Sequence, residues 1–488
     1  MDRRALLRAA TAAAAAAGVG VSARPGRAET AGVTASDAPR ADSRSTPVDL
    51  GPAAMACNIL TGGFVGDRPY VVSHLVEPAR LGLIDPVAGT VTHLAELPTG
   101  SSAWTSLVDG DQVYIGTNPV ADLYRFDASS LSLEHLASLP GATYVWDSCR
   151  TADGTIYLGT YPDGKIWEFD PGSDQLREIA VAVPGQAYVR SIVADDRYVY
   201  AGVGDQAHLV AFDRDSGERQ DITPPELAEE SFVYQLTQTS AHVIAGTHGN
   251  GLIAIVDKND PSSCRVVHPE GVVTVGKMAA LDDENVYFGA GNALWHLEVA
   301  TGTTRQLATT VEGDFVTALR IRGETVVVFT NSATMWTYDI TSGDLTSFDI
   351  AAAGMPRAPE LPQSVHAHDG ERIYVGGHGG VEVHDPARPG GAERLRVAGE
   401  AKAMTSVGRD LYFAMYPSGS IVRYDSARGS TETVAVVGNE QNRPGDMTYD
   451  PRSKLVLMTT SPDYGKLGGA LSAFHVPTGR LDVHRDVV

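Results

Sequence analysis

The chain of 488 residues is long enough to bury a large core, and its 43% hydrophobic and 20% charged residues are those of an ordinary globular protein. Its 51 glycines and 27 prolines suit a chain that is dense in turns and poor in long helices. The formal net charge of −22 argues against a nucleic-acid partner, because such affinity depends on many Lys and Arg side chains at phosphates.

Residues 1–28 predict a secretory leader of the twin-arginine type. The pair Arg3-Arg4 precedes an Ala-rich stretch, and small residues surround Ala28. The apolar stretch is short for a spanning helix, so we expect a secreted protein with no membrane attachment after the leader is removed. Residues 29–48 are small and polar and predict a disordered linker. The leader carries a net charge of +4, so its removal takes the chain from −22 to −26.

The clearest local pattern is a β-hairpin at residues 155–170. Apolar residues alternate along Thr155 to Thr160 and again up to Asp170, which is the period of a strand with one buried face. Pro162-Asp163-Gly164 between the two runs supplies the fixed φ, the side-chain hydrogen bond and the positive φ that a tight turn uses.

The same hairpin recurs along the chain about every 43 residues, with separations between 40 and 50. The residue that closes each copy is acidic in nine of ten cases: Asp85, Asp127, Asp170, Asp213, Asp257, Glu298, Asp339, Asp385, Asp425 and His475. A repeat of this length with one strand before and one strand after each hairpin predicts an all-β fold, a β-propeller of four-stranded blades.

Ten such units exceed the four to eight blades that propellers usually have. One arrangement is a single wide ring. The other closes seven blades over residues 49–350 and begins an incomplete second ring over residues 351–488, after the Pro- and Ala-rich seam at 351–364. The second arrangement exposes a strand edge. Both arrangements remain open at the level of the sequence.

Three cysteines, Cys57, Cys149 and Cys264, are too few and too scattered for a disulfide framework or a zinc site. No nucleotide-binding, zinc-protease or nucleophile-elbow motif occurs in a fitting context. We therefore expect no metal and no cofactor, and a monomer that meets an extracellular ligand.

In a four-stranded blade, the loop that leads into the inner strand and the loop between the second and third strands open on the same face. Loops on one face of a propeller converge on the mouth of its channel, where ligands bind. Positions that repeat one residue type, such as Gly159, Gly202, Gly246 and Gly289, are expected to be structural. Positions that differ between blades define the candidate site: Trp104, Trp146, Tyr161, Arg190, Tyr234, His248, His378, Lys402, Tyr416, Arg443 and Tyr464.

This set of aromatic and cationic side chains suits a sugar acid. Aromatic faces stack on pyranose rings, and Arg or Lys binds a carboxylate. For catalysis by β-elimination, Tyr161 and His248 are the candidate base and acid, and Arg190 would neutralise the uronic carboxylate. The facing carboxylates of a glycosidase cannot be identified.

The segments LGTYPDGKIWEFDP, RIYVGGHGGVEVHDP and FAMYPSGSIVRYD, together with NRPGDMTYD, resemble secreted actinobacterial propeller proteins with PQQ-binding-like or WD40-like repeats. The resemblance covers about residues 50–488 and implies the propeller fold. More distantly, the Tyr, His and Arg face is similar to that of propeller polysaccharide lyases that act on glucuronate-containing glycans.

Three classes of function remain. The first is a protein that binds, and by β-elimination cleaves, a uronic-acid-containing polysaccharide. The second is a non-catalytic glycan- or protein-binding propeller. A quinone-dependent oxidoreductase is the least favoured, because the five Trp residues stand at unmatched offsets and cannot supply a docking motif in every blade.

Overall fold

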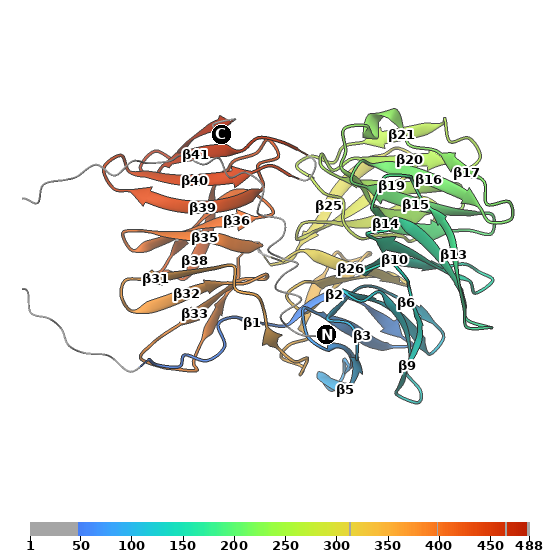
Figure 1. Ribbon diagram of the computed structural model, residues 1–488, viewed down its shortest axis with the longest axis horizontal. Coiled ribbons are helices and arrows are strands. Elements are labelled where there is room, and N and C mark those ends of the chain that lie inside the picture. Colours follow the sequence, from blue (N-terminus) through green and yellow to red (C-terminus); the bar gives the residue numbers. More distant parts are fainter. Residues whose placement is uncertain (1–46, 312–313, 398, 464–465, 486–488) are drawn as a thin grey trace, which may run out of the picture. The chain divides into compact units, whose positions relative to one another are not determined.

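The computed structural model describes residues 47–311, 314–397, 399–463 and 466–485, and the expected leader and most of the expected linker lie outside them. Ten successive units of four antiparallel strands make up the described chain, as the repeat predicts, and Figure 1 follows them in order of colour. One turn of 3-10 helix, Pro225–Leu227, precedes the fifth unit. The all-β propeller architecture is therefore confirmed.

The first seven sheets follow the chain without exchange of strands. The first sheet consists of β2 (Asn58–Val65), β3 (Arg68–His74), β4 (Ala79–Asp85) and β5 (Thr90–Leu97), the second of β6 (Ser102–Asp109), β7 (Gln112–Asn118), β8 (Asp122–Asp127) and β9 (Ser132–Ser138), and the third of β10 (Tyr144–Arg150), β11 (Ile156–Tyr161), β12 (Lys165–Asp170) and β13 (Gln175–Val181). The fourth consists of β14 (Tyr188–Ala194), β15 (Tyr198–Gly204), β16 (His208–Asp213) and β17 (Arg219–Asp221), and the fifth of β18 (Phe232–Gln238), β19 (His242–His248), β20 (Ile253–Asp257) and β21 (Cys264–Val267). The sixth consists of β22 (Met278–Ala280), β23 (Asn285–Ala290), β24 (Ala293–Glu298) and β25 (Thr303–Thr309), and the seventh of β26 (Val316–Arg322), β27 (Thr325–Thr330), β28 (Thr334–Asp339) and β29 (Leu345–Asp349).

Three more sheets follow the seam. The eighth consists of β31 (Ser364–His368), β32 (Arg372–Gly376), β33 (Val381–His384) and β34 (Glu393–Leu395). The ninth consists of β35 (Glu400–Val407), β36 (Asp410–Tyr416), β37 (Ser420–Asp425) and β38 (Ser430–Val436), and the tenth of β39 (Arg443–Asp450), β40 (Leu455–Ser461), β41 (Ala470–His475) and β42 (Arg480–Arg485). A short pair, β1 (Met55–Ala56) with β30 (Ala358–Pro359), joins the segment before the first sheet to the seam.

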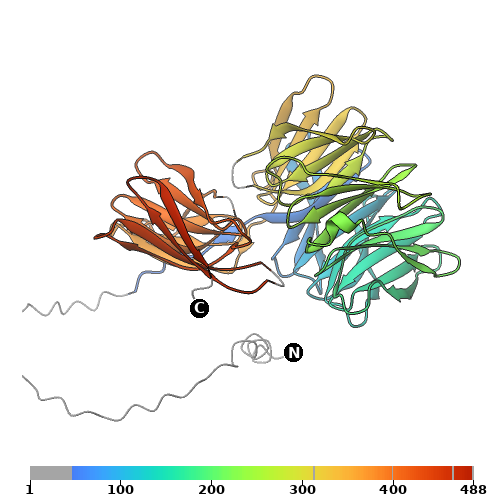
Figure 2. The same cartoon turned by 90° about the horizontal axis from the view of Figure 1, so that it is seen from above.

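The first seven sheets close into a ring. Each inner strand packs beside the next, from β2 through β6, β10, β14, β18 and β22 to β26, and β26 packs back on β2. The blue β2 and the yellow β26 accordingly lie side by side in Figure 1 and Figure 2. At the closure the ring of Phe64 contacts that of Phe329, and the backbone N–H of Ile59 donates to Asn331 O at 3.1 Å. Seven blades, and not ten, therefore surround this axis.

The repeated glycines lie where neighbouring sheets come closest, as the sequence predicts for structural positions. A Cβ on Gly159 would stand 2.6 Å from Val189 of the next inner strand, and one on Gly246 would stand 2.4 Å from Val275. Because real Cβ atoms do not approach other heavy atoms so closely, only glycine lets each valine pack against the next sheet.

The aspartate that closes eight of the ten hairpins fixes the turn after the third strand. Asp127 Oδ1 accepts from the backbone N–H groups of Ser129 and Ser130, and Asp339 Oδ1 accepts from those of Thr341 and Ser342. These are local Asx turns, in which a carboxylate satisfies backbone donors that the strands leave unpaired. The same hydrogen bonds lower the pKa of the Asp339 carboxyl, so the charged form that caps the turn is favoured.

The described residues include no helix long and apolar enough to cross a membrane. Within that same part of the chain, no group of three or more His, Cys, Asp or Glu side chains is arranged to hold a metal ion. The three cysteines are free thiols, and burial raises the pKa of Cys57 to about 12.

Candidate functional site

Most inner strands of the ring carry a bulge at the same place, and four of the predicted residues occupy it. The register against the second strand shifts around one residue in β2, β6, β10, β14, β18 and β26. The residues at the shift are Leu60, Trp104, Trp146, Arg190, Tyr234 and Thr317. A bulge re-aims the side chain that it leaves unpaired, so the strand geometry distinguishes these side chains from their neighbours.

Aromatic rings from the first five sheets form a continuous series of contacts, here called the aromatic belt. Neighbouring centroids lie between 4.2 and 6.2 Å apart. The belt consists of His74, Trp104, Trp146, Tyr144, Tyr161, Tyr188, Phe232, His248 and Tyr234. Most of its members are half-buried, so they pack on one another and still present ring surface.

Arg190 lies within the aromatic belt. Its guanidinium carbon is 4.0 Å from the ring centroid of Tyr234, 4.5 Å from that of Trp146 and 5.1 Å from that of Trp104. The residue is only 4% exposed. Cation–π contacts with three rings stabilise the charge without using its N–H donors.

Three buried donors in this region have no hydrogen-bond partner among the described residues. They are Nη1 of Arg190 and the indole Nε1 atoms of Trp104 and Trp146. A buried donor is normally paired, so these three atoms are available to an acceptor from outside the described residues.

A polar layer lies one residue further along the inner strands. Asp147 Oδ2 accepts from the backbone N–H of Ile192 at 3.2 Å and from Gln235 Nε2 at 3.4 Å. Its Oδ1 lies 3.7 Å from Lys277 Nζ. Burial lowers the pKa of Lys277; Asp147 opposes this effect, while the nearby Arg190 and Arg320 add to it. Side chains from the third, fifth and sixth sheets thus meet across the axis.

The three residues assigned to catalysis occupy different parts of the aromatic belt. Tyr161 stacks on Tyr188, with their ring centroids 4.2 Å apart. Arg190 lies elsewhere, among the rings of Trp104, Trp146 and Tyr234. Both nitrogens of His248 have contacts: Nδ1 lies 2.7 Å from Thr274 Oγ1, and Nε2 lies 3.1 Å from Asp463 Oδ2.

A second group of predicted residues gathers on the sheets after the seam. His378 Nδ1 lies 2.7 Å from Glu400 Oε1, and Lys402 Nζ contacts both Glu400 Oε2 at 2.5 Å and Gln363 Oε1 at 2.7 Å. Lys402 also lies over the ring of Tyr416 at 5.2 Å. These charges neutralise one another within the group.

The remaining two predicted residues come from the tenth unit. Arg443 opens β39, where it pairs in register with Ser461. Tyr464 lies outside the described residues.

The sequence did not single out several members of the site. Asp147 follows Trp146 directly in β10, and the same strand also contains Ser148 and Arg150, so a charged residue at this position was no distinct signal. Tyr144 and Tyr188 each stand two residues before a predicted position. Tyr144 contacts rings of its own sheet and Tyr188 contacts Tyr161 of the neighbouring sheet, whereas the contact of Asp147 with Lys277 joins the third and sixth sheets and depends on the curvature of the ring.

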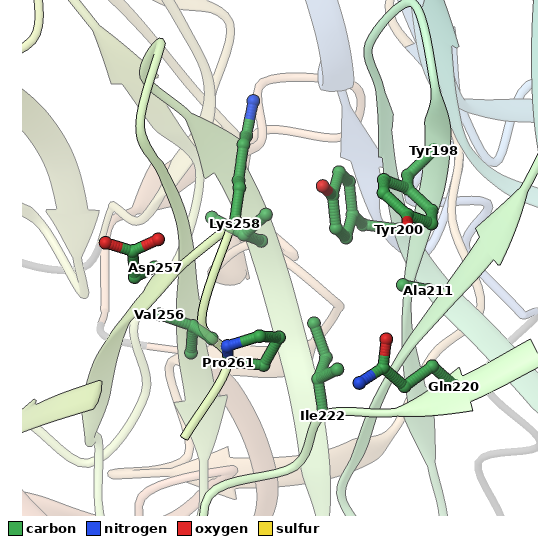
Figure 3. Close-up of a pocket in the computed structure, with 10 residues that line it drawn as sticks. Tyr198, Tyr200, Ala211, Gln220, Ile222, Val256, Asp257, Lys258 and Pro261 are labelled. Atoms are coloured by element: carbon green, nitrogen blue, oxygen red, sulfur yellow. The ribbon is translucent and has the colours of Figure 1, made fainter. Parts of the chain in front are cut away.

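Two hollows of the described chain lie away from the aromatic belt. Figure 3 shows one between the fourth and fifth sheets, where Tyr200, Ile222, Pro261 and Lys258 approach one another. Its volume of about 10 Å³ holds a single water at most. A wider hollow of about 510 Å³ lies over the second sheet near Asp122. Neither contains a residue predicted for function.

Comparisons with known proteins assign the chain to no family. No protein-family model matches the chain, and no curated protein matches it. Solved structures that resemble it include the computationally designed Ika8 protein, 17% identical over 69% of this chain and 99% of that one, with a TM-score of 0.46. Virginiamycin B lyase from Staphylococcus aureus is 12% identical over 58% and 94%, also with a TM-score of 0.46. The extracellular domain of a one-component system from B. thetaiotaomicron is 13% identical over 87% and 66%, with a TM-score of 0.38.

Proposed function

We propose that the seven-sheet ring binds a uronic-acid-containing saccharide at the aromatic belt. The observation that carries the proposal is the environment of Arg190: a buried guanidinium held between three aromatic rings, with one N–H group that has no protein acceptor among the described residues. A carboxylate is the acceptor that best matches a guanidinium, and aromatic faces provide the stacking that sugar rings use.

The charge distribution supports an acidic ligand at this place in particular. The chain as a whole carries −22, which disfavours capture of polyanions over the general surface. In the axis of the ring, by contrast, Arg190 and Arg320 lie close enough to Lys277 to lower its pKa, and Asp147 faces Lys277. The attraction for an anion is therefore local.

Binding without turnover is the form of the proposal that the geometry supports best. A general base needs a nitrogen or oxygen that is available to the substrate proton. His248 already uses Nδ1 and Nε2 in contacts with Thr274 and Asp463. Binding followed by cleavage through β-elimination is the alternative, and it predicts an unsaturated sugar product. The twin-arginine leader predicted for residues 1–28 and the resemblance of the sequence to secreted propellers support an extracellular location.

Calorimetric titration with a uronic-acid oligosaccharide and with a neutral glucan of equal length tests the proposal. We expect binding of the acidic sugar only, and Arg190→Gln is expected to weaken it by about 30-fold or more, because loss of one partner of a buried charged contact costs roughly 2 kcal/mol or more. Arg305→Gln, on the exposed outer strand β25, is the matched control. Equal binding of the neutral glucan would contradict the proposal, and a rise in ultraviolet absorbance during incubation would establish cleavage.

A further inference from the structure

The wider hollow over the second sheet contains a buried carboxylate with one unpaired oxygen. The hollow has a volume of about 510 Å³, and its walls come from the loop before β6 and from strands β8 and β9. Asp122 lines it from the start of β8 and is only 1% exposed. Its Oδ1 atom is buried and has no hydrogen-bond partner among the described residues. Because buried polar atoms are normally paired, Oδ1 is available to a donor that a ligand brings.

The two hydroxyl groups beside Asp122 have no proton left for Oδ1. Thr99 Oγ1 donates to Asp122 Oδ2. A Thr hydroxyl has a single proton, so in the 2.6 Å contact between Thr99 Oγ1 and Tyr124 Oη the donor is Tyr124. Both protons are then used, and both serve to hold the other oxygen of the carboxylate.

The imidazole of His135 lies near Oδ1 without satisfying it. Its Nε2 is 3.4 Å from Asp122 Oδ1 and forms no hydrogen bond there, and it is also 3.4 Å from Ser138 Oγ. The His135 side chain is 45% exposed, so an incoming group can take its place beside Oδ1 without disturbing the core. No Lys or Arg of the described residues forms an ion pair with Asp122.

We propose that this hollow binds a small molecule through a primary ammonium group, which donates to Asp122 Oδ1. An ammonium supplies both the N–H donor and the positive charge that a buried carboxylate requires. A neutral hydroxyl supplies a donor without the charge, and a quaternary ammonium supplies the charge without a donor. The site shares no residue with the aromatic belt, so the proposal is independent of uronate binding there.

The remainder of the hollow suits the carbon skeleton of such a molecule. Small-molecule sites in proteins have volumes of roughly 300–1,000 Å³, and the hollow falls within this range. Pro98 and Leu133 line it with apolar surface, while Ser138 adds a hydroxyl. An aliphatic amine would use the apolar wall, and an amino sugar would use the hydroxyl as well. The net charge of −22 favours the approach of either cation.

Calorimetric titration with pentylamine and with glucosamine tests the proposal and distinguishes the two sources of the ammonium group. Pentanol, glucose and pentyltrimethylammonium are the matched ligands that lack the charge or the N–H donor. We expect at least one of the two amines to bind and none of the three matched ligands to do so. Tighter binding of glucosamine would identify an amino sugar, and tighter binding of pentylamine an aliphatic amine.

Three variants locate the binding. Asp122→Asn keeps the shape of the side chain and removes its charge, so it is expected to weaken amine binding by about tenfold or more. His135→Lys, at a partly exposed position 3.4 Å from Oδ1, brings an ammonium from the protein itself and is expected to block the site. Glu134→Gln is the matched control: Glu134 stands between two lining residues of β9, is 59% exposed and does not line the hollow. It is expected to leave amine binding unchanged.

Each result either supports the proposal or overturns it. Amine binding that is lost in both Asp122→Asn and His135→Lys but kept in Glu134→Gln supports it. Binding of pentanol, glucose or pentyltrimethylammonium as tight as that of the amines overturns the requirement for a primary ammonium. Failure of both amines to bind, or amine binding that Asp122→Asn leaves unchanged, overturns the site. Thermal unfolding of each variant shows whether a loss of binding follows from loss of the fold, and His135→Lys, at its partly exposed position, then provides the second test.

Discussion

Single residues of this ring take their chemical character from their surroundings. Arg190 is a buried cation that aromatic faces stabilise, and Lys277 has its pKa lowered by burial although Asp147 lies 3.7 Å away. Burial also lowers the pKa of His74 to about 3; His378 adds to this effect, and Glu400 opposes it. His74, whose ring contacts Trp104 at 5.9 Å, is therefore neutral in the folded protein across most of the acidic range.

The low pKa of His74 predicts a loss of stability in acid. In the unfolded chain the imidazole binds a proton below about pH 6.5, whereas the folded protein resists protonation down to about pH 3. The free energy of unfolding should therefore fall as the pH falls through this window, with a contribution from His74 of up to about 1.4 kcal/mol per pH unit. Urea denaturation between pH 7 and pH 5 measures the slope.

Two variants test whether His74 is responsible for this pH dependence of the free energy of unfolding. His74→Gln is expected to flatten it, because the titrating group is gone. His484→Gln, at an exposed position of β42, is expected to leave it as in the parent protein. An unchanged slope in His74→Gln would contradict the assignment.

At the scale of the strand and the blade, the repeat has two physical causes. The closing aspartate caps the turn after the third strand, as in Asp127 with the N–H groups of Ser129 and Ser130. The glycine of the second strand lets a valine of the next inner strand pack on the backbone, as in Gly159 against Val189. Besides these two causes, most blades of the ring share a bulge on the inner strand, which turns the variable residue away from the hydrogen-bond ladder.

Gly159→Ala should therefore weaken the contact between the third and fourth sheets. The new Cβ would lie 2.6 Å from Val189 Cγ1 and 2.8 Å from Val189 O, so strand or side chain must shift. Overpacking of this kind costs about 1–3 kcal/mol in the free energy of unfolding, which denaturant unfolding measures. The double variant Gly159→Ala with Val189→Ala should recover part of the loss, and strict additivity of the two substitutions would argue against a direct clash.

For the whole molecule, the decisive event is the closure of the ring between β2 and β26. The closure depends mainly on side-chain packing. Phe329 is fully buried against Phe64. The guanidinium carbon of Arg322 lies 4.5 Å from the ring centroid of Phe64, and Arg322 also donates a hydrogen bond to Asp67. Because the first and seventh sheets each consist of consecutive strands, no strand from one end of the chain completes a sheet at the other.

Phe329→Ala is expected to open the ring at this junction first. Truncation of a buried Phe costs about 3–5 kcal/mol, and the loss should appear in hydrogen exchange as reduced protection of β2 and β26 before other inner strands. Phe169→Ala removes an equally buried ring between the second and third sheets, away from the closure. It should lower global stability by a similar amount without that local pattern, and the same exchange profile in both variants would contradict a weak closure.

The sequence by itself determined the ten units, their strands and turns, and the positions of the variable residues on the inner strands. Those features follow from local causes, namely the alternation of apolar residues, Asx turns and close-packed glycines, which repeat within about 43 residues. Only the tertiary structure decided that seven sheets close, that Asp147 meets Lys277 across the axis, and that Arg190 lies among aromatic rings from three sheets. Such contacts depend on where the curvature of the stacked sheets brings distant strands together, and the spacing of residues along the chain does not specify that curvature.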